Sequence, residues 1–176
     1  MWYVIKTAAG REEAACHKCK TAFPESAYSD LFVPSYEKPF CRDGKWIVSR
    51  VALFPGYIFA DTDADHAEDI RRILESQMSA TAQPVCAGED FVPVHEDEQT
   101  FLSGLMDERH VISISRGDMI GNRLVVHEGP LKHHTGNISW INRHKRMAGL
   151  RAYLLRKERN IKVGLEIIHK TGAKAG

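Results

Sequence analysis

The sequence contains neither a long apolar run nor a secretion signal. No stretch of its 176 residues approaches the ~18 uninterrupted apolar residues that a membrane-spanning helix needs. The N-terminus also lacks the basic region, apolar block and small-residue cleavage site of a signal peptide. We therefore expect a cytoplasmic protein that makes no contact with a membrane.

Catalytic motifs are absent as well. The chain has no G-x-S-x-G, no glycine-rich phosphate loop and no H-E-x-x-H. Its close acidic pairs, Asp61 with Asp63 and Asp97 with Glu98, lie at expected helix starts or turns, where N-capping accounts for them. The sequence predicts that the protein is not an enzyme and needs no cofactor.

Cysteine is scarce, with four residues in the chain. Cys16 and Cys19 form a C-x-x-C pair with zinc-ligand spacing, and Cys41 and Cys86 could complete four ligands. However, the pair falls on the apolar stripe of an expected helix, and the chain has no second C-x-x-C pair. We predict buried, reduced thiols, with no disulfide and no metal site.

The net charge of +1 conceals a strong asymmetry along the chain. Residues 1–116 carry 12 Lys and Arg against 19 Asp and Glu, whereas residues 117–176 carry 12 against 4, together with five of the nine histidines. A basic C-terminal third and an acidic remainder suggest different partners for the two parts, and the basic part suits a polyanion.

The first 107 residues alternate between strand and helix patterns. Runs of aromatic and β-branched residues predict strands, and apolar residues at helical spacing predict amphipathic helices. The expected strands cover 2–7, 31–36, 45–48, 53–61 with a break at Pro55-Gly56, and weakly 84–91, and the expected helices cover 11–23, 65–76 and 97–107. This order fits an α+β N-terminal domain with helices over a small, mostly antiparallel sheet.

The C-terminal part has an all-β pattern. Residues 108–116 show no helical stripe and lie where the charge changes sign, so we interpret them as a linker. Five short strands then follow within 117–170, and a small closed barrel is favoured because closure removes exposed sheet edges. Residues 171–176 are expected to form a frayed tail.

Within this part, two apolar runs flank a polar segment that begins with Gly129 and Pro130 and ends with Gly136. This pattern predicts a hairpin whose loop carries basic residues, and a second basic group follows the second strand. Lys and Arg can neutralise phosphates, and histidine adds hydrogen bonds. The candidate RNA-binding residues are Lys132, His133, His134, Arg143, His144, Lys145 and Arg146.

The stretch that includes Gly129, Pro130, Leu131, Lys132 and Gly136 resembles a KOW motif, although His133 stands where that motif usually has a small residue. The opening Trp2-Tyr3-Val4 and the block Phe54-Pro55-Gly56-Tyr57 resemble the N-terminal domain of the NusG family of transcription elongation factors. Together the two resemblances cover about the whole chain. They imply an α+β domain at 1–107, a linker at 108–116 and an SH3-like KOW barrel at 117–170.

The resemblance also implies partners. In the family, the strand after the FPGY block helps to line an apolar pocket that docks on the clamp helices of RNA polymerase. The residues that match it here are Trp2, Phe54, Pro55 and Tyr57. The opposing interpretation is that these aromatic residues are simply core residues of a strand.

The basic C-terminal part favours a specialised paralogue of the LoaP antiterminator type, in which the KOW domain binds RNA such as a leader hairpin. We expect a monomer that acts as a processive antiterminator. One alternative is a housekeeping NusG whose KOW domain binds a termination factor or a ribosomal protein. The others are a ribosome-associated KOW protein and, with least support, a zinc or hydrolytic enzyme.

Overall fold

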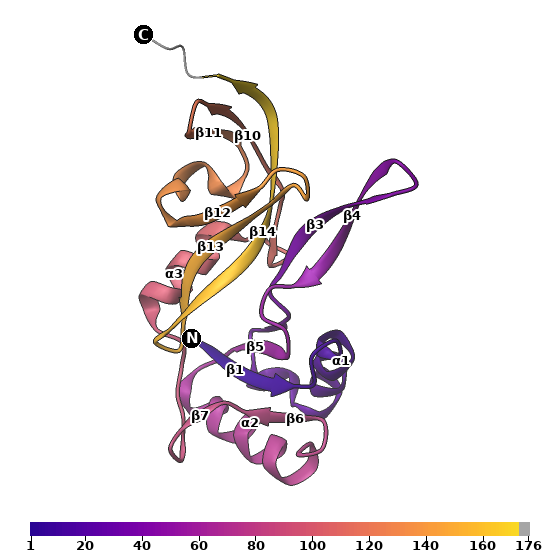
Figure 1. Ribbon diagram of the computed structural model, residues 1–176. Helices are drawn as coiled ribbons and strands as arrows, with labels where there is room; N and C mark the ends of the chain where they lie inside the picture. The colour runs from indigo at the N-terminus through magenta and orange to yellow at the C-terminus, as the bar shows by residue number, and fades with distance from the viewer. Residues whose placement is uncertain (173–176) are drawn as a thin grey trace. The chain divides into compact units, whose positions relative to one another are not determined.

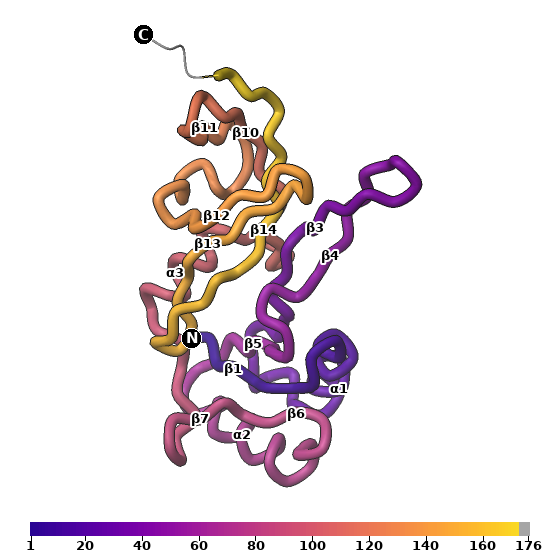
Figure 2. Tube along the Cα trace, viewed as in Figure 1, coloured from indigo at the N-terminus to yellow at the C-terminus, as the bar shows by residue number. Residues whose placement is uncertain are grey.

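The computed structural model describes residues 1–172, which form two compact units (Figures 1 and 2). Unit 1 contains residues 1–34, 54–100 and 154–156, and unit 2 contains 35–53, 101–153 and the chain from Lys157 onward. Of the expected tail, residues 173–176 lie outside the described residues.

Unit 1 is built on a four-stranded antiparallel sheet in the order β2-β5-β1-β6. Its strands are β1 (Trp2–Thr7), β2 (Asp30–Phe32), β5 (Tyr57–Asp61) and β6 (Ala82–Pro84). Helix α1 (Glu12–Ala22) lies near β2 and β5, and helix α2 (Ala64–Gln77) lies near β6 (Figure 1). The remaining elements are η1 (Glu25–Ala27), β7 (Cys86–Ala87), β8 (Asp90–Phe91) and the first residues of α3 (Glu96–Leu105).

The core of unit 1 contains a cluster of four aromatic rings, which we call the aromatic cluster: Trp2, Phe32, Phe54 and Phe59. Phe59 is fully buried at its centre and contacts the other three, with ring centroids 5.7–5.9 Å apart. Trp2 and Phe32 also meet edge to face at 5.3 Å. Ring pairs in this range of distances add to the stabilisation from buried area.

Unit 2 contains a five-stranded sheet in the order β11-β10-β14-β13-β12 and a three-stranded sheet in the order β4-β3-β9. Strands β3 and β4 form a long antiparallel hairpin in this unit (Figure 2). The bounds are β3 (Ser35–Arg42), β4 (Lys45–Ala52), β9 (Val111–Ile112), β10 (Ser115–Ile120), β11 (Arg123–Glu128), η2 (Pro130–His133), η3 (Thr135–Asn137), β12 (Ile138–Asn142), β13 (Met147–Leu154) and β14 (Lys157–Thr171).

The expected fold class, an α+β N-terminal part followed by an all-β part, is confirmed, and the three helices lie where their apolar stripes predicted. The expected strand over 31–36, however, is divided into β2 and β3, which belong to different sheets. Pro34 lies at the break, and proline has no backbone N–H to donate to a sheet. Within the interval interpreted as a linker, residues 111–112 form β9, which pairs with β3, and β10 begins at Ser115. The linker role itself stays a prediction.

The expected hairpin around the KOW-like segment is wrong. In the described pairings β11 pairs with β10 and β12 pairs with β13, so the segment between β11 and β12 crosses between strands through two 3₁₀ turns. Leu131 is fully buried, and its N–H donates to the Ser115 hydroxyl at 3.0 Å. Gly129 has φ 90°, and a Cβ there would lie 2.6 Å from Ser115 Oγ. These contacts hold the start of the segment against β10 instead of leaving it as a free turn.

Among residues 1–172, no helix is long and apolar enough to cross a membrane. Within the same residues, no three His, Cys, Asp or Glu side chains form a group that could hold a metal ion.

Candidate partner-binding surfaces

The FPGY loop, residues 54–57, is held in place by backbone hydrogen bonds and one buried carboxylate. Thr7 N–H donates to Gly56 O at 2.8 Å, and Gly56 N–H donates to Glu12 Oε1 at 2.6 Å. The same carboxylate oxygen accepts from Gly10 N–H at 2.9 Å. Gly56 has φ 83°, and a Cβ there would lie 2.9 Å from Thr7 O, so the turn requires glycine.

Glu12 lies in the first turn of α1 and is only 6% exposed. Burial raises the pKa of its carboxyl, but the hydrogen bonds from Gly10 and Gly56 outweigh burial, and the pKa lies below its ordinary value. The residue therefore stays ionised and joins α1 to the FPGY loop. The sequence showed it only as an acidic residue at a helix start, which is usual near the positive end of a helix dipole.

The four candidate polymerase-binding residues divide into two classes. Trp2 and Phe54 are 7% and 5% exposed and belong to the aromatic cluster. Pro55 is exposed and Tyr57 is half-buried. Of the four residues, Pro55 and Tyr57 are therefore accessible to a partner at the surface of unit 1, whereas Trp2 and Phe54 are buried. The binding role of all four stays a prediction.

The residues of the first basic segment, 132–134, differ in their exposure. Lys132 and His133 are exposed, but His134 is half-buried and its ring meets Phe101 edge to face at 5.1 Å. Burial lowers the pKa of the His134 imidazole below its ordinary value, and His133 adds to the effect. His134 is thus held in its neutral form near neutral pH, and it contributes packing instead of charge.

The second basic segment is the turn between β12 and β13. Arg143, His144 and Lys145 are exposed, and Asn142 Oδ1 accepts from Lys145 N–H at 3.0 Å. Arg146 differs from them, because it is half-buried with φ 51° and its guanidinium has two partners within unit 2. That group pairs with the Glu166 carboxylate at 2.5 Å and lies 4.0 Å from the centre of the Trp46 ring.

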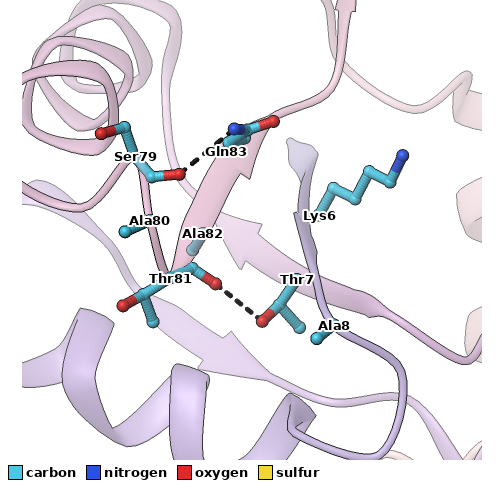
Figure 3. Close-up of a pocket in the computed structure, with 8 residues that line it drawn as sticks. All are labelled: Lys6, Thr7, Ala8, Ser79, Ala80, Thr81, Ala82 and Gln83. Atoms are coloured by element: carbon cyan, nitrogen blue, oxygen red, sulfur yellow. Dashed lines mark hydrogen bonds between the residues drawn. The ribbon is translucent and has the colours of Figure 1, made fainter.

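A shallow pocket of about 190 Å³ lies in unit 1 between the end of β1 and the segment that joins α2 to β6 (Figure 3). Thr7 Oγ1 donates to Thr81 O at 2.8 Å, and Gln83 Nε2 donates to Ser79 O at 3.2 Å (Figure 3). Lys6 is the one charged residue among the eight that line it. Since these side-chain groups already bond within the protein, the pocket offers little to a ligand.

The cysteines of α1 are expected to be unreactive in the folded protein. Burial raises the pKa of the Cys16 thiol to about 11 and that of Cys19 to about 12, so neither forms appreciable thiolate at pH 8. Cys41 is exposed on the β3–β4 hairpin. Iodoacetamide at pH 8, followed by mass spectrometry of the peptides, should label Cys41 first and leave Cys16 and Cys19 unmodified until denaturant is added. Rapid labelling of either α1 thiol in the native protein would contradict their buried placement.

Comparison with known proteins identifies the family. Residues 1–101 match the family model described as "Transcription termination factor nusG". This match covers more than half of the chain. The chain belongs to the NusG family. The prediction of a non-enzymatic protein is thereby confirmed, because NusG-family transcription factors are not enzymes, and membership implies binding to RNA polymerase.

Two individual relatives of this NusG-family chain agree with that assignment. The "Transcription termination/antitermination protein NusG" of Thermus thermophilus is 28% identical over 151 residues, which are 80% of this chain and 82% of the relative. A solved structure, "Domain interaction in Thermotoga maritima NusG", covers 94% of this chain and 93% of its own, with a TM-score of 0.53 and 18% identity. The second likeness concerns the fold.

Proposed function

We propose that this NusG-family protein is a processive antiterminator of the LoaP type, which binds RNA polymerase through unit 1 and RNA through the basic segments of unit 2. The polymerase contact would be centred on Pro55 and Tyr57, the exposed members of the FPGY loop. The factor would favour the elongation-competent state by binding it more tightly than the paused state, since a ligand shifts an equilibrium only through such a difference.

The observation that carries the RNA proposal is the exposure of Lys132, Arg143 and Lys145. These side chains make no ion pair with an acidic residue within 1–172, whereas Arg116 pairs with Glu128 and Glu166. Exposed, uncompensated cations release counterions when they bind phosphates, and this gives a salt-dependent gain in affinity. Arg146, which the sequence placed in the same group, would support the surface through Glu166 and Trp46 instead of contacting RNA.

Changing Lys132, Arg143 and Lys145 together to glutamine is expected to weaken RNA binding about tenfold or more at moderate salt. Each lost phosphate contact should also reduce the slope of log K against log salt by about 0.7–0.9, so the slope should fall by about 2–3 for the three contacts. The probe is a pool of stem-loop RNAs with a fixed stem and a randomised loop, and binding is measured by fluorescence anisotropy at several salt concentrations.

The matched control changes Arg123, Lys157 and Lys162 to glutamine. These residues are also exposed in unit 2, so the control removes the same charge from other positions. If both triple variants lose the same affinity, the effect is one of net charge and the basic segments are not a site. If the unchanged protein binds no RNA of the pool, the proposal fails.

A second candidate function is termination or ribosome coupling, in which unit 2 binds a termination factor or a ribosomal protein. The names of the matched family and of the Thermus thermophilus relative, which include termination, favour it. In vitro transcription through a terminator separates the two functions. Antitermination raises readthrough when the leader RNA is present, whereas the alternative leaves readthrough unchanged or lowers it.

A further inference from the structure

The β3–β4 hairpin of unit 2 exposes more apolar surface than a strand pair of a monomeric protein usually does. Phe40, Trp46, Ile47 and Val48 are 36–51% exposed, and all four lie in this one hairpin. Exposed apolar side chains that lie together often mark a binding site, and Phe40 lies directly opposite Ile47 in the ladder. The hairpin forms a regular antiparallel ladder from Ser35 opposite Ala52 to Arg42 opposite Lys45, so it is a well-formed element.

The register of the ladder assigns its side chains to two faces, because directly opposite residues share a face. One face carries Glu37, Arg50 and Trp46. Residues of this face contact the rest of unit 2: Glu37 Oε2 accepts from Ile114 N–H at 2.9 Å, Arg50 Nη2 donates to Arg109 O at 3.3 Å, and Arg146 lies over Trp46. The other face contains the buried Tyr36 and five exposed residues, which we call the outer hairpin face: Lys38, Phe40, Arg42, Lys45 and Ile47.

The outer hairpin face combines an exposed aromatic ring with three exposed cations. Phe40 lies directly opposite Ile47, and Arg42 lies directly opposite Lys45 at the tip. Arg42 pairs with Asp43, whose carboxylate is 3.9 Å from Arg42 Nε, with both side chains at least 75% exposed to water. So weak a pair leaves the local charge positive.

This combination suits a nucleic acid better than a protein. Bases stack on an exposed aromatic ring while cations beside it neutralise the phosphates. Protein interfaces are instead depleted of lysine, and two of the three cations here are lysines.

The position of the hairpin within unit 2 connects it to the basic segments. Arg146 ends the turn that presents Arg143 and Lys145, and its guanidinium lies on the Trp46 ring of the hairpin. Because Trp46 belongs to the opposite face of the hairpin from Phe40, the basic segments adjoin the hairpin on the side away from the outer hairpin face.

We propose that the outer hairpin face is a second RNA-binding surface of unit 2, on which Phe40 stacks an unpaired base and Lys38, Arg42 and Lys45 contact the phosphates beside it. This inference rests on the proposed RNA-binding function. Recognition of RNA by sequence is directed mainly to unpaired bases, which a stacking ring can hold.

The test uses the full chain and the tightest-binding stem-loop from the randomised pool, with the fully paired stem and the same stem-loop made of DNA as comparison probes. Phe40→Ala should weaken binding to the RNA loop about tenfold, within the range measured for a stacked base. Phe40→Tyr keeps the ring and should restore binding. Tyr153→Ala, which removes another exposed ring of unit 2, should change little.

The charges are tested by changing Lys38, Arg42 and Lys45 to glutamine, beside the control at Arg123, Lys157 and Lys162. The hairpin variant should reduce the salt slope, as the variant of the basic segments does, and the control should not. In addition, benzoylphenylalanine placed at position 40 should crosslink to the RNA loop, whereas the same group at position 153 should not.

Each remaining outcome overturns the inference in a distinguishable way. If the hairpin variants bind RNA like the unchanged protein while the Lys132, Arg143 and Lys145 variant does not, the RNA-binding function stands and the hairpin has no part in it. Equal binding and equal losses with the DNA stem-loop would assign the face to DNA. Loss of polymerase binding alone would assign it to a protein. If the unchanged protein binds no RNA, both proposals fail.

Discussion

Replacing Phe54 with alanine is expected to lower the free energy of unfolding by about 3–5 kcal/mol, the usual cost of removing a buried aromatic side chain. Phe54 is 5% exposed, and its ring is stacked on Phe59 at 5.9 Å with 26° between the planes. Phe59 has no exposed surface and also contacts Trp2 and Phe32. The neighbours cannot fill the space easily, because the cluster already packs around Phe59 on several sides.

Tyr57→Ala provides the contrast to this large effect. Tyr57 is half-buried at the start of β5, so its loss should cost about 1 kcal/mol or less. If Tyr57 contacts the polymerase, its removal should weaken binding to RNA polymerase while the protein remains folded. Phe54→Ala should weaken binding only to the extent that it unfolds unit 1 or displaces the loop.

Urea denaturation and competition for purified RNA polymerase measure the two effects separately. Phe40→Ala serves as the control for stability, because that ring is 36% exposed on the hairpin. A Phe54→Ala protein as stable as the parent would show that the ring is not packed as described. A stable protein that no longer binds polymerase would make Phe54 a direct contact.

The sequence predicted where β5 lies in the chain, but it did not predict which side chains of the strand are buried. Pro55 and Gly56 mark the turn, and alternation places Tyr57 and Phe59 on the same face of the strand. In the structure Phe59 is buried and Tyr57 is half-buried. Phe59 is buried because Trp2 and Phe32, which are distant in the chain, pack against it. The local alternation pattern contains no information about such distant residues.

The basic segments illustrate the same limit for charge. Composition shows that Lys132, Arg143 and Arg146 are cations, but it does not show which of them an acid neutralises. Arg146 pairs with Glu166, 20 residues later, and packs on Trp46, 100 residues earlier. These partners follow from the strand order β14-β13-β12 and from the packing of the hairpin within unit 2. The two basic segments were thus identified from sequence, but their division into exposed and engaged residues was not.

Replacing Glu12 with alanine is expected to destabilise the protein by about 2 kcal/mol, because a buried donor that loses its partner costs about 1–3 kcal/mol. The change leaves the buried N–H of Gly56 without its acceptor, whereas Gly10, which loses the same acceptor, is exposed and can bond to water. Since Gly56 lies within the FPGY loop, the substitution should also loosen the position of Tyr57. Polymerase binding should therefore fall further for Glu12→Ala than for Glu13→Ala, which removes an exposed acid from the next position of α1.

The dependence on pH gives this prediction a specific signature. The pKa of the Glu12 carboxyl is lower in the folded protein than in the unfolded chain, so its contribution to stability is complete above the unfolded-state pKa. That contribution is lost as the pH falls through the lowered folded-state pKa. The difference in unfolding free energy between the parent protein and Glu12→Gln should thus be large at neutral pH and shrink in acid, whereas Glu13→Gln should show little difference at either pH. A difference for Glu12→Gln that stays constant across this range, measured by urea denaturation at each pH, would show that Glu12 acts through its shape instead of its charge.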